Sequence, residues 1–303
     1  MNLDLKGIEL VWLSQTDLTN LNAGEGGTNL VDVKKYIRDG IEFPYVSGQA
    51  MRFYLRESVR RALPESKFMC TPNDKGENCG NHKDCLNCDL FGYMLPKKGE
   101  GAGVRVSPVK VSTAMGLLPL ESNSTMDFLT RKKRKEEGEK ARLDIVNVEL
   151  GINLYKCGVS IDVKRIGFVE ELDEDTKVLK YEPFIGESEI KERINLVLNG
   201  IQFLSDYSKQ ARLLTDFTPD VILVSKQTRY SHRLQKAFQL DENGHLSPER
   251  FQAIVSDLQE YSEVFFGTLP GTLPNEQEIV KAAKESGLDV LKPNEVISKL
   301  VLQ

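Results

Sequence analysis

The most constraining feature of this sequence is a long β-branched segment, LDIVNVELGINLYKCGVSIDVKRIGFVEE, at residues 143–171. Its apolar and polar residues partly alternate, which is typical of strands with one face in a hydrophobic core. VRVSPVKVSTAMG at residues 104–116 and GIELVWLSQTDL at residues 7–18 share this character, and the apolar run at residues 221–224 predicts a buried strand. These segments together predict an antiparallel sheet.

Three helices are predicted from apolar residues at helical spacing. Ser47 can cap the first, which ends before Pro64 and has an apolar face of Met51, Leu55, Val59 and Ala62. The second has an apolar face of Ile190, Ile194, Val197, Leu198, Ile201 and Leu204. The third starts at Ser247, Pro248 and Glu249 and has a core face of Phe251, Ile254, Val255 and Leu258. Residues 275–300 predict two further short helical pieces.

The order of these elements indicates the fold class. Strands and helices do not follow a regular βαβ repeat, so an α+β fold is expected, in one domain of residues 1–303. Residues 64–103 are rich in Gly, Asn, Lys, Asp and Cys without sustained periodicity, which indicates an irregular insertion outside the sheet. Residues 122–140 are polar and highly charged and predict a protruding hairpin or loop.

Charge is unevenly distributed along the chain. The net charge of -5 and the pI near 5.5 argue against a protein that coats DNA generically. Residues 34–61 nevertheless hold seven Lys/Arg against three Asp/Glu, and residues 131–142 hold seven against three again. Residues 170–192 reverse the balance, with nine acids against three bases. The acidic total therefore hides two basic segments that could each meet phosphate.

The N-terminal residues bear on the cellular compartment. They lack the basic start and apolar run of a secretory signal, and no stretch of the chain approaches the roughly 20 apolar residues of a membrane span. We therefore expect a cytoplasmic protein without membrane partners.

The first predicted helix carries a possible phosphate site. Its first turn, near Ser47, Gly48 and Gln49, offers free N–H groups, and Arg52 and Arg56 lie one and two turns further along. A helix N-terminus with nearby guanidinium groups suits a phosphate. An ordinary solvated face, with its arginines paired to acids, is the alternative from spacing alone.

Two further segments could contact nucleic acid. Lys209, Gln210 and Arg212 group cationic and amide side chains before a predicted strand, although a plain surface loop fits equally. The basic run that includes Arg131 and Lys132 follows two apolar residues. These residues, Met126 and Phe128, could wedge against bases while the basic run meets the backbone. A solvated charged loop is the alternative for this run.

Four cysteines lie close together in the insertion. Cys70, Cys79, Cys85 and Cys88 are separated by eight, five and two residues, and His82 offers an alternative ligand. Structural zinc in a closed tetrahedral site would stabilise a segment with little core of its own. The final CLNC pair is a specific signal, whereas the first two spacings are not standard, and reduced free thiols are the alternative.

Signals of catalysis are weak. None of the three histidines, His82, His232 and His245, lies in a recognisable catalytic motif, and the chain has no phosphate-binding loop or dinucleotide fingerprint. Asp17 and Asp32 flank a glycine-rich segment and could act in acid–base or metal chemistry, but carboxylates that cap turns fit the same pattern.

Several short motifs resemble one known family. FPYVSGQAMRFYLRE, CDLFGYM, VSPVKVSTAMGLLPL and SKQARLLTDFTPDVILV are similar, in this order, to the DevR-type backbone subunit of type I CRISPR interference (Cascade) complexes, a member of the RAMP superfamily. The type I-B version is the most similar, and the resemblance extends over residues 5–224. It implies a modified RNA-recognition-motif (ferredoxin-like) palm, an inserted finger at about residues 64–103 and a thumb hairpin at about residues 112–142.

The resemblance also implies a function. Copies of such subunits stack into a helical filament along guide (CRISPR) RNA beside other Cascade subunits, and the guide pairs with target DNA. Ser47, Gly48, Gln49, Arg52 and Arg56 would then contact guide phosphates. Lys209 and Gln210 would form a second backbone-holding loop, and the region around Met126 to Lys132 would belong to the thumb. Arg60 and Arg61, nearer the helix end, are expected to pair with acids.

A non-catalytic, guide-binding subunit is the preferred interpretation. The alternative is a metal-dependent endoribonuclease that cuts guide-paired target RNA through Asp32, because related type III backbone subunits cut with an aspartate before the same helix. A guide-processing ribonuclease of this superfamily usually relies on a histidine-centred site, which the sequence does not display.

Overall fold

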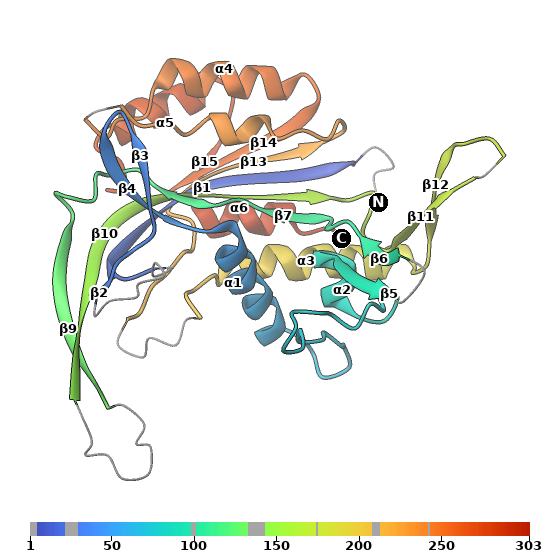
Figure 1. Cartoon of the computed structure of the whole chain (residues 1–303). Helices are drawn as coiled ribbons and strands as arrows, with labels where there is room; N and C mark the ends of the chain where they lie inside the picture. The colour runs from blue at the N-terminus through green and yellow to red at the C-terminus, as the bar shows by residue number, and fades with distance from the viewer. Residues whose placement is uncertain are drawn as a thin grey trace, which may run out of the picture.

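A large sheet lies between two layers of helices in the computed structural model (Figure 1). The structure describes residues 5–21, 30–97, 101–132, 143–173, 175–207, 213–241 and 243–303. The main sheet has the order β15 (Val290–Leu291), β14 (Ser262–Thr268), β13 (Val221–Gln227), β1 (Gly7–Thr19), β10 (Leu143–Asp162), β8 (Ala114–Gly116), β4 (Ile41–Val46) and β3 (Lys35–Arg38). Three further strands also pair with β10: β2 (Leu30–Val31), β7 (Val109–Val111) and β9 (Ser124–Lys132).

Most neighbours in this sheet are antiparallel, as the sequence predicts. The centre is β1, which pairs with β10 from Gly7 opposite Asp162 to Thr16 opposite Asn153, and with β13 on its other edge. The two parallel pairs are β2 with β10 and β14 with β15. The chain is thus a mixed α+β protein with a predominantly antiparallel sheet.

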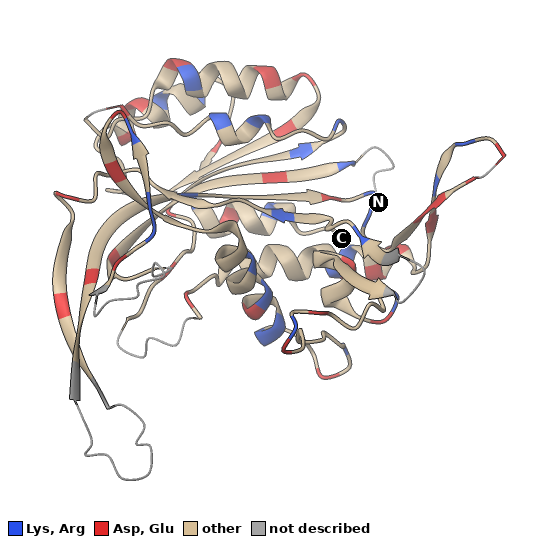
Figure 2. Ribbon diagram, viewed as in Figure 1, with Lys and Arg blue, Asp and Glu red and all other residues tan. Residues whose placement is uncertain are grey.

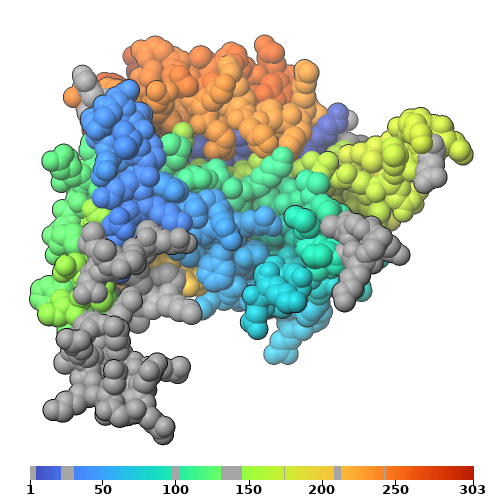
Figure 3. Space-filling view, in the orientation of Figure 1, coloured from blue at the N-terminus to red at the C-terminus, as the bar shows by residue number. Residues whose placement is uncertain are grey.

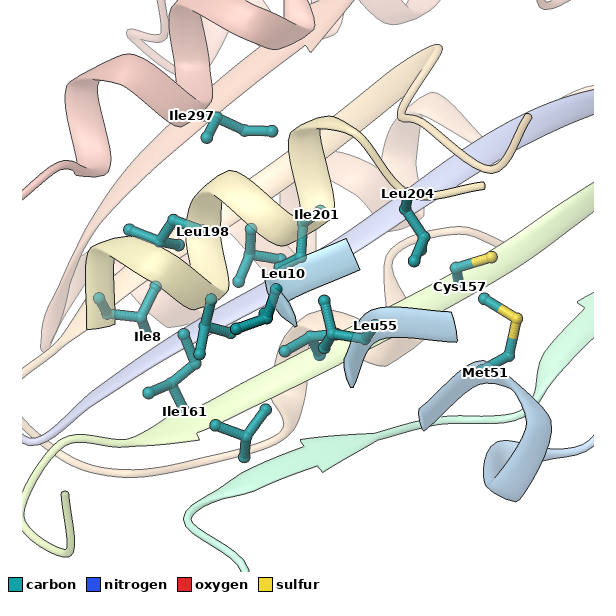
Figure 4. Packing of buried hydrophobic residues seen from close by; sticks show 14 of the residues in the cluster. Ile8, Leu10, Met51, Leu55, Cys157, Ile161, Leu198, Ile201, Leu204 and Ile297 are labelled. Carbon is teal, nitrogen blue, oxygen red and sulfur yellow. The ribbon is translucent and has the colours of Figure 1, made fainter. Parts of the chain in front are cut away.

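Helices cover both faces of this sheet, and each face has its own core. On one face lie α1 (Gly48–Arg61), α3 (Glu187–Gln202) and α6 (Pro293–Leu300), and on the other α4 (Pro248–Gln259), α5 (Glu276–Glu285) and the 3-10 helix η1 (Arg233–Lys236). Because strand residues alternate, Ile8 and Leu10 of β1 enter the first core while Val11 and Leu13 enter the second. Figure 4 shows the first core, where Leu55 of α1 packs among residues of the sheet and α3.

The predicted helices are confirmed with two corrections. Ser47 and Ser247 accept hydrogen bonds from the N–H groups of Ala50 and Arg250 and so cap α1 and α4. Ala62 is exposed and not part of the core face, because α1 ends at Arg61 and the backbone then turns away before Pro64. Leu204 is buried, but it lies beyond the end of α3. Within the described part of the chain, no helix is long and apolar enough to cross a membrane.

The insertion is more regular than the sequence predicts. It contains α2 (Leu86–Phe91) and a separate two-stranded hairpin, β5 (Tyr93–Lys97) and β6 (Gly101–Arg105). The expectation that residues 64–103 are irregular is therefore wrong in part, whereas their place outside the main sheet is as expected. Its strands contain Pro96 and two glycines, which weaken the alternation that signals a strand.

Two hairpins project from opposite ends of the molecule (Figure 1). One pairs β9 with the first half of β10, from Ser124 opposite Gly151 to Lys132 opposite Leu143, and confirms the predicted protruding hairpin. The other pairs β11 (Phe168–Leu172) with β12 (Leu179–Pro183), and every residue of β12 is exposed. This second hairpin lies within the acidic segment.

One buried carboxylate makes the stability of this fold depend on pH. Glu9 of β1 is fully buried and accepts hydrogen bonds from the side chains of Gln227 and Gln235 and from the N–H group of Leu234. Burial, only partly offset by these hydrogen bonds, raises the pKa of Glu9 from 4.5 to about 7. The folded protein therefore holds this proton more tightly than the unfolded chain, and its stability falls as the pH rises from about 4.5 to 7.

We expect Glu9→Gln to remove this part of the pH dependence. Between pH 4.5 and 8, the wild type should lose on the order of 3 kcal/mol more of its free energy of unfolding than Glu9→Gln does. Urea unfolding across this range measures the difference, and Glu263→Gln, which alters an exposed carboxylate on β14, is the control. Parallel pH profiles for wild type and Glu9→Gln would contradict the assignment.

Candidate nucleic-acid interface and metal centre

The start of α1 presents unpaired donors at the surface. Strand β4 ends at Val46, and Ser47 turns the chain into the helix, where its Oγ accepts from the Ala50 N–H group at 3.3 Å. A Cβ atom on Gly48 would lie 3.3 Å from the Val111 carbonyl oxygen, so a small residue lets the helix start close to the sheet. No residue in the described part of the chain accepts from the N–H groups of Gly48 and Gln49. These groups can receive an anion.

Two arginines follow on the same helix without carboxylate partners. Arg52 and Arg56 are both half-buried, and within the described ranges neither forms an ion pair. Burial is the main cause that lowers the pKa of both guanidinium groups. The positive charge of Arg56 lowers the pKa of Arg52 further, and that of Arg60 lowers the pKa of Arg56. Figure 2 shows basic residues along α1, and Figure 3 shows the helix surface between the β3–β4 hairpin and the insertion. Desolvated, unpaired cations of this kind attract phosphate.

The last two arginines of α1 behave differently. Arg60 forms an ion pair with Glu57, with its Nε 3.2 Å from Oε1, as expected. Arg61 instead lies over the ring of Tyr207, 4.8 Å from its centroid, so the expectation that it pairs with an acid is wrong. Tyr207 is brought there by the turn after α3, which the spacing of apolar residues does not predict. This difference in partners supports the separation of Arg52 and Arg56, the candidate phosphate-binding residues, from Arg60 and Arg61.

The β9–β10 hairpin carries the predicted apolar residues. Met126 is 54% exposed and Phe128 69% exposed, while Leu129 on the opposite face packs against Val146 and Val148 of β10. Alternation along β9 thus leaves one face of the hairpin open. Arg131 and Lys132 lie at the end of β9, but their side chains are outside the described structure. Lys209, Gln210 and Arg212 also lie outside the described residues.

The four cysteines of the insertion gather into one cluster. The Sγ atoms of Cys70, Cys79, Cys85 and Cys88 all lie within 4.8 Å of one another. Those of Cys70 and Cys88 are 3.9 Å apart and those of Cys79 and Cys88 3.5 Å apart, close to the separation of about 3.8 Å in a tetrahedral zinc site. Three of the thiols are buried, and that of Cys79 is exposed.

Hydrogen bonds support this donor set. The N–H group of Cys70 donates to Cys85 Sγ at 3.3 Å, and Asn87 Nδ2 lies 3.5 Å from Cys70 Sγ. A hydrogen bond from the Cys88 thiol lowers the pKa of Cys85 to about 4 and raises that of Cys88. His82 is not part of the cluster: its Nδ1 lies 3.1 Å from Tyr93 Oη, and its ring packs against Phe184. The geometry therefore fits a site of four cysteines.

Comparisons with known proteins decide the family. The model of the CRISPR-associated negative auto-regulator DevR/Csa2 family matches residues 15–231. The chain belongs to this family. The model names no subtype, so the similarity to the type I-B version stays a prediction. A search of curated proteins found no match.

Solved structures show where the DevR/Csa2 fold recurs. A chain of a CRISPR RNA-guided surveillance complex is 14% identical, with a TM-score of 0.58 over 97% of this chain and 98% of that one. A chain of a CRISPR RNA-guided surveillance complex in a pre-nicking state is 10% identical, with a TM-score of 0.59 over 97% and 99%. At these identities the likeness concerns the fold.

The other candidate residues of this DevR/Csa2 chain are dispersed. Asp32 is half-buried just after β2, and among the described residues it does not join two further potential metal ligands. Asp17 lies on β1, far along the sequence from His232 and His245. In the described chain neither of these histidines belongs to a group of potential metal ligands. The cysteines are the one such group found in this part of the molecule.

Two features of this DevR/Csa2 chain are absent from the sequence-based predictions. Phe53 is 39% exposed, and its spacing of four from Gln49 and three from Arg56 places it on the same helix face. That spacing could have revealed it.

The second feature is a buried ion network in which Asp89 of α2 pairs with Arg105 and Arg193. Its members lie far apart in sequence, so no pattern could have signalled it.

Proposed function

We propose that this DevR/Csa2 chain is a non-catalytic backbone subunit of a CRISPR effector complex that binds the phosphate backbone of guide RNA. The observation that carries the proposal is the start of α1, where two N–H groups and two arginines lie together without acceptors or acids among the described residues. Phosphate contacts of this type are independent of base sequence, which suits a subunit that must hold any guide. Target DNA would then be selected by base pairing with the guide.

The strand order supports a ferredoxin-like, RNA-recognition-motif palm. The strands β13, β1, β10 and β7 or β8 lie side by side and antiparallel, with α1 and α3 on one face. In chain order this is a β-α-β-β-α-β unit with its last strand beside its first. The insertion at about residues 64–103 would be the finger, and the β9–β10 hairpin would be the thumb. Stacked copies would form a filament along the guide with other Cascade subunits.

The nucleic acid that co-purifies tests the proposal. Protein purified from cells that express its CRISPR locus should carry short RNAs with one common, repeat-derived end. Sequencing of the extracted RNA identifies them, and the Arg52 and Arg56 variant described in the Discussion serves as the control. Random cellular RNA, or no RNA, would count against a guide-binding role.

Zinc is the metal that best fits the cysteine cluster. We expect close to one zinc ion per chain in protein purified without chelators, because four clustered thiols form a closed site. Elemental analysis of Cys85→Ser with Cys88→Ser should give a ratio near zero. Cys157→Ser, which alters a buried cysteine of the main core, should keep its zinc. A wild-type ratio near zero would remove the zinc assignment.

The endoribonuclease alternative makes the opposite prediction about Asp32. We expect neither wild type nor Asp32→Ala to cut guide-paired RNA in the presence of divalent metal ions, because Asp32 lies apart from further ligands in the described structure. A gel-based cleavage assay measures this. Cleavage by the wild type that Asp32→Ala abolishes would establish the alternative.

A further inference from the structure

The cysteine cluster lies directly against the arginines of α1. Arg60 reaches out of the helix to the segment that carries Cys70: its Nη2 donates to the Cys70 carbonyl oxygen at 3.3 Å and its Nη1 to Thr71 Oγ1 at 2.8 Å. The same Nη1 lies 3.5 Å from the Met69 carbonyl oxygen. One guanidinium group therefore fastens the end of α1 to the backbone around the first cysteine.

Arg52 also contacts a segment that holds the thiols. The Arg52 guanidinium lies 5.9 Å from the ring centroid of Phe91, a fully buried residue at the end of α2, three positions after Cys88. The Nε of Arg52 is buried and has no hydrogen-bond partner among the residues that the structure describes. Arg52 and Arg60 thus each contact a cysteine-bearing segment.

The thiols join these two segments at their surface side, while Met69, Leu86 and Phe91 anchor the same segments in the main core. The local cluster of buried residues consists of Cys70, Cys85 and Cys88, with Tyr93 packed against it. The backbone adds one bridge, in which the Leu86 N–H group donates to the Phe68 carbonyl oxygen at 2.9 Å. A metal ion bound to all four thiolates would fix the spacing of residues 70, 79, 85 and 88, and with it the carbonyl groups of Met69 and Cys70 that hold Arg60.

We propose that the metal site positions the phosphate-binding arginines, so that metal binding and guide-RNA binding strengthen each other, with Arg60 as the connecting residue. The inference rests on the proposed guide-binding function. Its physical basis is that guanidinium groups held in place lose less side-chain freedom when RNA binds. Linkage then requires that RNA tightens metal binding by the same factor by which metal tightens RNA binding.

Metal release gives a test that does not depend on activity. Zinc transfer from the holoprotein to a chromogenic chelator is measured with and without saturating single-stranded RNA. RNA should slow the transfer by about tenfold in the wild type. Arg60→Met keeps the side-chain stem but loses the donors, so it should bind one zinc ion, bind RNA at saturation and show no protection. Arg233→Met, which alters an exposed arginine paired with Asp257, should behave as the wild type.

A cobalt-substituted protein adds a spectroscopic readout of the same linkage. RNA should shift the visible absorption of the cobalt–thiolate site in the wild type and leave it unchanged in Arg60→Met. Equal protection or equal spectral shifts in both proteins would overturn the role of Arg60. RNA binding without any effect on the metal in the wild type would overturn the linkage alone, whereas failure of the wild type to bind RNA would overturn the proposed function with it.

Discussion

Arg52→Glu combined with Arg56→Glu is expected to abolish RNA binding, with a loss in affinity of at least about 100-fold at physiological salt. The change removes two cations that have no carboxylate partner in the described structure and places two anions beside the free N–H groups of α1. The fold should survive, because neither arginine forms an ion pair with another described residue. Filter binding and the ratio of absorbance at 260 and 280 nm of the purified protein measure the effect.

A matched charge change separates this site from bulk electrostatics. Lys281→Glu with Lys284→Glu alters the net charge equally, but both lysines are exposed on α5, across the sheet from α1. This control should bind RNA close to normally. Neutral Arg52→Gln with Arg56→Gln should lower the slope of the salt dependence by about 1.4, since each lost contact to single-stranded RNA removes about 0.7. RNA retained by the charge-reversed protein at the wild-type ratio would contradict the assignment.

Asp89→Ala is expected to destabilise the protein by about 3 to 5 kcal/mol. Asp89 is fully buried, accepts from Arg193 Nη1 at 2.7 Å and from the Gly167 N–H group, and pairs with Arg105. Its removal leaves two largely buried guanidinium groups without this partner, although Arg193 keeps Glu189. Because Asp89 belongs to α2 and Arg193 to α3, the loss should also loosen the insertion from the helical layer.

Chemical denaturation measures this effect, and Asp257→Ala is the control. Asp257 forms an ion pair with Arg233, but both side chains are substantially exposed, so its loss should lower the free energy of unfolding by less than about 1 kcal/mol. Hydrogen exchange should report faster opening of residues 64–97 in Asp89→Ala. Equal losses of stability in the two variants would show that burial of the network contributes little.

Much of the fold could be predicted because local and global signals agree. The helices α1 and α4 each combine a serine cap with an apolar face, and β13 has a continuous apolar run; the structure confirms all three. Strand β12 could not be predicted, because a strand with every residue exposed has no hydrophobic alternation, whereas most of β11 lies in the segment at residues 143–171 that was predicted as strands. Strand β14 was also missed, although four of its seven residues are buried.

The candidate sites, like the fold, could be predicted from the sequence only in part. The stripe on α1 could be predicted because helical spacing fixes which side chains share a face. The cysteines were predicted as ligands from composition, but only the structure separates them from His82, because the loop between Cys79 and Cys85 has no regular geometry from which the direction of a side chain follows. The roles of Lys209, Gln210 and Arg212 remain predictions.

The pairing of strand β10 joins the projecting hairpin mechanically to the centre of the sheet. Its second half pairs with β1 at the centre of the sheet, and its first half, up to Gly151, pairs with β9 in the projecting hairpin. The hairpin is therefore a cantilever: its fixed end, where Ser124 lies opposite Gly151, adjoins the central sheet, and Met126 and Phe128 are exposed along its inner half. A force at the exposed end is transmitted along continuous backbone into the central strand, so the hairpin can bend elastically while the register of β1 with β10 is kept.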